Sequence, residues 1–428
     1  MKKWLLLITF FSASVHIIYA QNQNIENLLF NLPDVIFKKI ETPDSFKCAY
    51  ELKVRQPLDH FDLTKGFFYQ KAFLSHRAFD RPTVINTAGY SKRKNNILEI
   101  TELLSANQIA VEHRFFGESL PDSLDYKYLN LKQATADLHH INQLFKKIYK
   151  GKWVSSGISK GGVTSIFYRY FYPNDVDVSI PYVAPLNKER EDKRVYTFLD
   201  TVGTDECREK IKSFQIRLLE NRDTVLTFLK FYSLGAGLEF KYLTFEQAFE
   251  YAVMEYPFAF WQWGDSCQNI PGNDTSLQEA VKYFLTKKPL SLFSDEDIKY
   301  FGPHYYQSAA EMGYYGYETY KFRDLIKSLP TDTNPQATFV PSKMNVSFDG
   351  RLLQDVHEWI EDKGNKFIYI YGSTDTWSAC AVSPSEHVDS KRFFIDGHHG
   401  LARISNMSQK DKQILIRTLE DWLSLKIE

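Results

Sequence analysis

Apolar and polar positions follow two different rhythms along this chain. Short runs rich in β-branched and aromatic residues predict strands at residues 50–55, 68–75, 83–87, 108–111, 152–155, 176–180, 366–371 and 392–395. Apolar residues at helical spacing predict helices at residues 96–105, 131–149, 163–171, 352–361 and 408–426. Strands that alternate with helices indicate a mostly parallel sheet covered on both faces. The pattern therefore predicts an α/β fold.

This alternation is lost between about residues 187 and 345. Here the pattern predicts only helices, at residues 210–222, 224–232, 244–256 and 277–284, with aromatic loops at 256–264 and 313–317. About 250 residues suffice for one α/β domain, so this segment is surplus to it. We expect residues 21–186 and 346–428 to form one α/β domain in two parts. Residues 187–345 would then form a helical cap over the carboxyl ends of the strands.

The chain begins with a basic start and an apolar run. Residues 1–20 have the form of a secretory signal peptide, which predicts an exported protein, periplasmic or extracellular. No later segment has the apolar length of a membrane span, so we expect no stable membrane anchor. Export favours disulfides. Four cysteines allow three connectivities, and Cys207 with Cys267 is the expected pair because both lie in the helical segment; Cys48 and Cys380 are the others.

Composition narrows the range of partners. The formal net charge of −1 over 428 residues gives no reason to expect nucleic acid or an anionic membrane surface as a partner. The cysteines and histidines form no cluster with zinc-ligand spacing, so we expect no metal site. The chemistry described below needs no organic cofactor. The oligomeric state is left open.

A sharp turn offers a nucleophile. Gly157-Ile158-Ser159-Lys160-Gly161 fits the G-x-S-x-G nucleophile elbow, with a predicted strand before it and a helix after it. Side chains at the two glycines would collide with the neighbouring strand and helix. Ser159 is thus the expected nucleophile, and the backbone N–H of Lys160 is an expected oxyanion donor. The second donor should come from the loop after the third strand, at Gly89 or Tyr90.

A base and an orienting acid follow the serine in the order that this architecture requires. Asp375 comes shortly after the predicted strand 366–371, and the pair His398-His399 follows the strand 392–395. Because the carboxyl ends of parallel strands meet at one edge, these groups can converge on Ser159. His398 is the preferred base because it follows Gly397 directly after the strand, and His399 is the alternative. The residues predict a serine hydrolase with an acyl-enzyme intermediate.

Two motifs resemble a known family. Glu112-His-Arg-Phe-Phe-Gly-Glu-Ser119 closely resembles the signature of lysosomal Pro-Xaa carboxypeptidases and related dipeptidyl peptidases. Gly157–Gly162, with Phe115-Phe116, is even more similar to secreted bacterial tripeptidyl aminopeptidases of the PS-10 type. The resemblance runs from about Val54 to the last helix. It implies an α/β-hydrolase fold with a helical cap, and an exopeptidase that releases short N-terminal peptides, often around proline. In the carboxypeptidase relatives the first histidine acts, whereas the histidine before glycine, here His399, is the alternative for the bacterial branch.

An aminopeptidase must recognise a free α-ammonium group, and a carboxylate is its natural partner. Glu118, beside the elbow, and Glu255, in the aromatic cap segment, are the candidates; Glu118 could instead pair with Arg114 or Lys160. Trp261 and Trp263 could line a pocket for an apolar or prolyl side chain, or belong to the core of the cap. Peptides, cut as tripeptides, are the expected substrates. An esterase or lipase with the same triad, or a binding protein without turnover, is the alternative.

Overall fold

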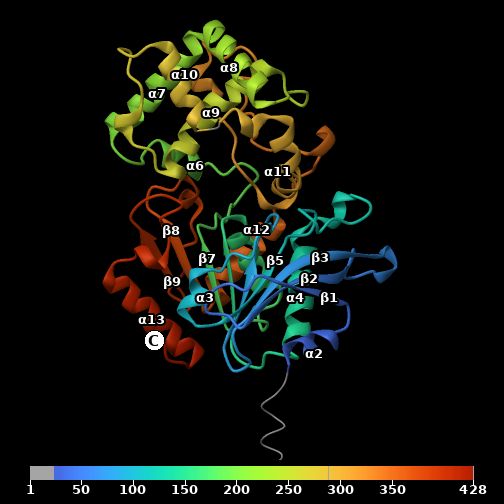
Figure 1. The fold of residues 1–428 in the computed structure, drawn as a ribbon. Helices are drawn as coiled ribbons and strands as arrows, with labels where there is room; N and C mark the ends of the chain where they lie inside the picture. The colour runs from blue at the N-terminus through green and yellow to red at the C-terminus, as the bar shows by residue number, and fades with distance from the viewer. Residues whose placement is uncertain (1–23, 288, 428) are drawn as a thin grey trace, which may run out of the picture.

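The computed structural model describes residues 24–427 except residue 288, so the predicted signal peptide lies outside the described residues. The chain forms a sheet domain with a helical cap above it (Figure 1). In the described residues the sheet has nine strands in the order β1-β2-β3-β5-β4-β6-β7-β8-β9. Their bounds are β1 Val35–Ile40, β2 Cys48–Pro57, β3 Phe67–His76, β4 Thr83–Thr87, β5 Asn107–Val111, β6 Trp153–Ile158, β7 Val178–Tyr182, β8 Ile368–Gly372 and β9 Lys391–Ile395.

The sheet changes character along its width. β1, β2, β3 and β5 pair antiparallel, whereas the strands from β5 across to β9 pair parallel. The parallel strands β4, β5, β7 and β8 are buried along their whole length, as strands covered on both faces must be. Together with the strand–turn–helix at Ser159, this topology is that of an α/β-hydrolase fold.

Helices cover both faces of the sheet. The helices α4 (Leu131–Phe145), α5 (Lys160–Phe171) and α12 (Arg351–Lys363) bury their apolar sides on one face. The helices α3 (Glu99–Leu103) and α13 (Gln409–Leu423) pack on the other face, against β4 and β6 to β9. A short helix, α2 (Ile25–Phe30), lies beside β1. The two apolar layers bring the carboxyl ends of the parallel strands to one edge, beneath the cap (Figure 1).

The cap lies between β7 and β8 in sequence and has its own apolar core. Its helices are α6 (Arg194–Leu199), α7 (Asp205–Glu220), α8 (Arg222–Ala236), α9 (Phe245–Trp263), α10 (Leu277–Thr286) and α11 (Asp295–Gln307), with a π-helical turn η5 (Ser308–Met312) after α11. The expected disulfide between Cys207 and Cys267 is present, with Cα atoms 5.4 Å apart, and Cys48 and Cys380 are buried free thiols. Among the described residues, no helix combines the length and apolar content that crossing a membrane requires.

Candidate active site

The nucleophile elbow forms at the junction of β6 and α5. Ser159 has φ 57° and ψ −126°, a strained backbone that lifts its side chain out of the turn. A Cβ at Gly157 would collide with the carbonyl of Gly161, and a Cβ at Gly161 would collide with the carbonyl of Thr87. The two glycines are therefore required by the close approach of strand and helix, as the sequence predicts.

Asp375 and His399 meet at the same edge of the sheet. Asp375 follows β8 and His399 follows β9, and Nδ1 of His399 lies 2.7 Å from Oδ2 of Asp375. Both side chains are buried. The carboxylate therefore holds the ring proton on Nδ1 and leaves Nε2 to accept another proton. The cap contributes as well, because the backbone N–H of His399 donates to the carbonyl of Gln262 at 3.1 Å and the ring lies 5.9 Å from that of Trp263.

His398, the preferred candidate from the sequence, lies in a different place. Its ring packs against Gly264, where a Cβ would collide with it, and its Nδ1 accepts a 3.2 Å hydrogen bond from the N–H of Gly400. Gly397 has φ 120°, and this turn directs the two successive histidines differently. The structure thus pairs Asp375 with the alternative, His399, rather than with His398.

The expected oxyanion donors lie beside Ser159. Lys160 is the first residue of α5, so its backbone N–H has no partner within the helix. The loop after β4 packs on the elbow so closely that a Cβ at Gly89, which has φ 74°, would collide with Gly161. Tyr90, Ser159 and Lys160 line one cavity.

This cavity lies between the elbow and the cap. Its volume is about 370 Å³, within the range of ligand sites. The walls are rich in aromatic residues, and α9 contributes one face of the helix, at Glu255, Ala259, Gln262 and Trp263. Further lining comes from Pro185, Asn187, Phe301, His304, Met312, Tyr314, Tyr315, Tyr317 and Trp377. The cavity therefore joins the nucleophile to a buried carboxylate.

Glu255 is the carboxylate of that wall. The hydroxyls of Tyr315 and Tyr317 donate to its Oε2 at 2.9 and 2.7 Å. Burial raises the pKa of Glu255 to about 7, and the two tyrosine hydroxyls offset only part of this effect. Of the two tryptophans, Trp263 lines the cavity and is 62% exposed, whereas Trp261 is buried and lines a separate cavity within the cap.

Glu118 lies away from the cavity. Its carboxylate pairs with Lys71 and lies 4.0 Å from Lys53, and its side chain is 53% exposed. The hydrogen bond from Lys71 lowers the pKa of Glu118. Neither of the alternative partners contacts it, because Arg114 binds Asp137 and the Lys160 ammonium donates to the Gly89 carbonyl at 2.9 Å. The expectation that Glu118 faces the substrate site is therefore corrected.

The side chain of Lys160 does not face solvent. It is 2% exposed, and burial lowers its pKa to about 7 despite the opposing charge of Glu311. Glu311 is a residue that sequence reasoning missed. It lies in η5, and its Oε1 accepts the N–H of Leu131 at the start of α4 at 2.7 Å. Burial raises the pKa of Glu311 to about 8.

No metal site accompanies this arrangement within the part of the chain that the structure describes, where no group of His, Cys, Asp and Glu side chains could hold an ion. The chemistry available is that of a serine, an imidazole bound to a carboxylate, and backbone donors. This set is sufficient for acyl transfer.

Comparisons with known proteins agree with the geometry. A family model described as PS-10 peptidase S37 matches residues 20–424. A prolyl tri/tetrapeptidyl aminopeptidase of Streptomyces mobaraensis is 28% identical over 401 residues, which cover 92% of this chain and 83% of the relative. The human lysosomal Pro-X carboxypeptidase is 24% identical over 175 residues, 36% of this chain and 35% of that protein.

The chain is also similar to solved structures at low sequence identity. A proline iminopeptidase of Mycobacterium smegmatis aligns with a TM-score of 0.41 at 12% identity, over 87% of this chain and 99% of that chain. The family match covers nearly the whole chain, including the elbow and both loops that carry Asp375 and His399. The chain therefore belongs to the PS-10 peptidase S37 family and is a serine peptidase.

Proposed function

We propose that this peptidase is an exported exopeptidase that releases short peptides, chiefly tripeptides, from free N-termini. The observation that carries the proposal is the shared cavity, whose wall contains both Ser159 and the buried Glu255 of α9. The predicted signal peptide at residues 1–20 supports export. The name of the Streptomyces mobaraensis relative supports the substrate class and a preference around proline.

In the proposed reaction Ser159 attacks the scissile carbonyl while Nε2 of His399 takes the hydroxyl proton. Asp375 keeps the imidazole in the required tautomer. The carbonyl oxygen gains negative charge, which the N–H groups of Lys160 and Tyr90 (or Gly89) stabilise. His399 then returns the proton to the leaving amine, and water hydrolyses the acyl-enzyme to release the peptide acid. No metal or organic cofactor takes part.

The length of α9 supports release of three residues. Trp263, beside the His399 ring, and Glu255 are eight residues apart on this helix, which is about 12 Å at the rise of an α-helix. Three residues of an extended peptide span about 10 Å. One hydrogen bond of about 3 Å then joins the α-ammonium group to a carboxylate. Glu255 would thus bind the substrate N-terminus when the third peptide bond lies at Ser159.

Paired substrates test the proposal. The enzyme is given tripeptidyl-aminomethylcoumarins that differ only in a free or an acetylated N-terminus, and products from longer peptides are identified by mass spectrometry. We expect hydrolysis of the free form alone and stepwise release of tripeptides. Equal hydrolysis of the acetylated substrate would defeat the exopeptidase proposal.

The assignment of the base has its own test. Replacing His399 by Ala should lower kcat by about 10⁴-fold or more, as removal of a triad member does. The matched variant His398→Ala should keep kcat within about threefold of the wild type. The opposite ranking of the two variants would return the role to His398. Labelling of Ser159 by a fluorophosphonate, lost in Ser159→Ala, identifies the nucleophile independently of the substrate.

A further inference from the structure

The loop that follows β4 is held by residues of two sequence motifs. It carries the expected second oxyanion donor. These motifs contribute three hydrogen bonds: Lys160 Nζ to the Gly89 carbonyl at 2.9 Å, the His113 N–H to the Tyr90 carbonyl at 3.1 Å, and the Lys92 N–H to Oε2 of Glu112 at 2.7 Å. Lys160 belongs to the elbow, and Glu112 and His113 open the Glu112–Ser119 signature.

The first of these bonds determines the direction of one N–H group. The Gly89 carbonyl and the Tyr90 N–H belong to one peptide unit, which is planar and trans, so they point in opposite directions. The hydrogen bond from the Lys160 ammonium to the Gly89 carbonyl therefore also fixes the direction of the Tyr90 N–H. Among the described residues this N–H donates to no protein acceptor, and Tyr90 lines the cavity together with Ser159. An unused donor in this place is what an oxyanion requires.

The Lys160 side chain is well suited to hold the carbonyl. It is buried, and its ammonium lies 5.7 Å from the ring centre of Tyr90 and 5.5 Å from that of Phe116. Both rings attract a cation, so the charge is kept in place without an ion pair to a carboxylate. The ammonium form of Lys160, which prevails below its pKa of about 7, also favours negative charge that develops beside it.

The signature supplies the support beneath the loop. Oε1 of the buried Glu112 accepts the N–H groups of Glu118 and Ser119 at 2.8 and 2.9 Å, and the Ser119 hydroxyl at 2.8 Å, while its Oε2 holds Lys92. A Cβ at Gly117 would collide with this carboxylate.

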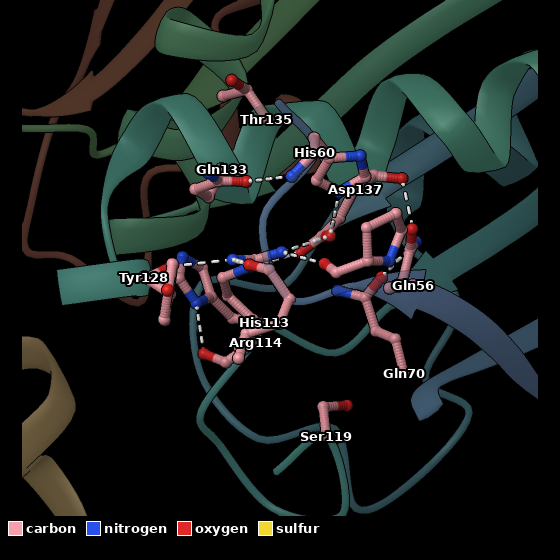
Figure 2. Close-up of polar contacts among 12 residues, drawn as sticks. Gln56, His60, Gln70, His113, Arg114, Ser119, Tyr128, Gln133, Thr135 and Asp137 are labelled. Carbon is pink, nitrogen blue, oxygen red and sulfur yellow. Dashed lines mark hydrogen bonds and ion pairs between the residues drawn. The ribbon is translucent and has the colours of Figure 1, made fainter. Parts of the chain in front are cut away.

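Arg114 anchors the same segment from the other side. It binds both oxygens of Asp137 at 2.7 and 2.8 Å, and Figure 2 shows this pair within a network that includes His60, Gln56 and Gln70. The segment is thus tied to α4 and to the antiparallel strands. The carboxylate of Glu112 and the guanidinium of Arg114 bind other groups of the protein, which explains a specific motif outside the cavity.

We propose that the Lys160 side chain and Glu112 are positioning residues that hold the Tyr90 N–H toward the tetrahedral intermediate on Ser159. The proposal selects Tyr90 over Gly89 as the second donor and gives the signature a catalytic consequence without substrate contact. It rests on Ser159 as the nucleophile, which is part of the proposed function. It does not depend on where a peptide is cut.

Lys160→Met tests the proposal, because methionine keeps much of the shape and removes the charge and the donor. With a p-nitrophenyl ester that acylates Ser159, and with a peptide substrate, kcat should fall about 100-fold while KM changes less than threefold. The Ki of a peptidyl trifluoromethyl ketone, which forms a tetrahedral adduct, should rise by the same factor as kcat falls. The Ki of the tripeptide product, a ground-state ligand, should stay the same. Lys160→Arg should restore part of kcat.

Lys71→Met is the matched control. Lys71 is also a buried lysine that binds the signature, through Glu118, but it lies outside the cavity. Lys71→Met should leave the ratio of the ketone Ki to the product Ki unchanged. Thermal unfolding shows whether each variant is folded; if Lys160→Met is not, Glu112→Gln is measured in the same way and should raise the ketone Ki about tenfold.

Two outcomes overturn the proposal. One is a kcat within threefold of the wild type in a folded Lys160→Met or Glu112→Gln variant. The other is a parallel loss of affinity for the ketone and the product, which would show general damage to the site. Because the ester reports on Ser159 alone, failure of the exopeptidase assignment would leave this result interpretable.

Discussion

Asp137, a buried carboxylate of the sheet domain, differs from Glu255, a buried carboxylate of the cap. In the sheet domain, burial alone would raise the pKa of Asp137, but the charge of Arg114 and the contact with His60 outweigh it and hold the pKa below its usual value. In the cap, burial dominates and raises the pKa of Glu255 to about 7. Its protein partners are two tyrosine hydroxyls, Tyr315 and Tyr317, which carry no charge at neutral pH.

This difference teaches how to separate structural from functional charge. A buried carboxylate with a cationic partner is complete in the folded protein, and its role is to hold segments together. A buried carboxylate that lines a cavity and has only uncharged protein partners costs free energy until a cation binds it. Asp137 belongs to the first kind and Glu255 to the second. The four predictions that follow test this distinction.

The largest effect on the free energy of unfolding is expected for the Arg114–Asp137 pair of the sheet domain. Replacing Arg114 by Met leaves Asp137 buried without its main cation, which should lower the free energy of unfolding by about 3–5 kcal/mol. Urea denaturation measures it. The control is Arg351→Met, which removes an exposed ion pair with Asp349 and should cost less than about 1 kcal/mol. A cost below 1 kcal/mol for Arg114→Met would contradict the structural role of the pair.

Removing the charge of Glu255 in the cap should instead raise the free energy of unfolding, and the gain should depend on pH. The raised folded pKa of Glu255 means that folding is favoured fully below the unfolded pKa, near 4.5, and that this stability is lost as the pH rises through about 7. The side chain at position 255 in the Glu255→Gln variant cannot ionise, so this variant does not lose that stability as the pH rises. Its free energy of unfolding should therefore gain on the wild type between pH 5 and pH 8, by up to about 3 kcal/mol.

Urea midpoints of the two proteins at both pH values measure that gain. The groups around Glu255 are the hydroxyls of Tyr305, Tyr314, Tyr315 and Tyr317, whose pKa values are all raised well above 10 by burial. They stay neutral over this range, so a gap that grows with pH reports on Glu255. A gap that is constant with pH would mean that Glu255 is already ionised and paired at pH 5.

The same variant should lose preference for a free N-terminus. At pH 7.5 Glu255→Gln should lower kcat/KM for a tripeptidyl-aminomethylcoumarin with a free α-amine about 30-fold, because a hydrogen bond between charged groups is replaced by a weaker one, at a cost of about 2 kcal/mol. For the acetylated substrate the variant should match the wild type. Retained preference for the free amine would remove Glu255 from the site, even if its pH-dependent stability is as expected.

The sequence predicts well what local chemistry determines. The parallel strands, the elbow at Ser159 and the position of Asp375 follow from short patterns, because a strand end and a tight turn are local features. β1 is absent from the sequence prediction because Lys38 and Lys39 weaken its apolar pattern, and pairing with β2 compensates. The predicted helix 244–256 continues to Trp263 through Pro257, as the packing of the cap outweighs the local preference.

The sequence does not determine the direction in which a side chain points. His398 and His399 are adjacent, and the turn at Gly397 together with contacts to the cap determines which one meets Asp375. Likewise Glu118 is near the elbow in the predicted topology, yet it faces Lys71. Both outcomes depend on segments that are far apart along the chain, which no short pattern contains.

The smallest effect on the free energy of unfolding is expected for replacement of Glu118. The hydrogen bond from Lys71 lowers the pKa of Glu118, so its contribution is present above the unfolded pKa and is lost as the pH falls through the lower folded value. This sign is opposite to that of Glu255.

Because the side chain of Glu118 is half exposed, Glu118→Gln should lower the free energy of unfolding at pH 8 by less than about 1 kcal/mol. The free-versus-acetylated preference should stay within twofold of the wild type, measured beside Glu255→Gln with the same substrates. A loss of preference in Glu118→Gln as large as in Glu255→Gln would show that charge near the elbow, and not a buried carboxylate awaiting its cation, selects the substrate N-terminus.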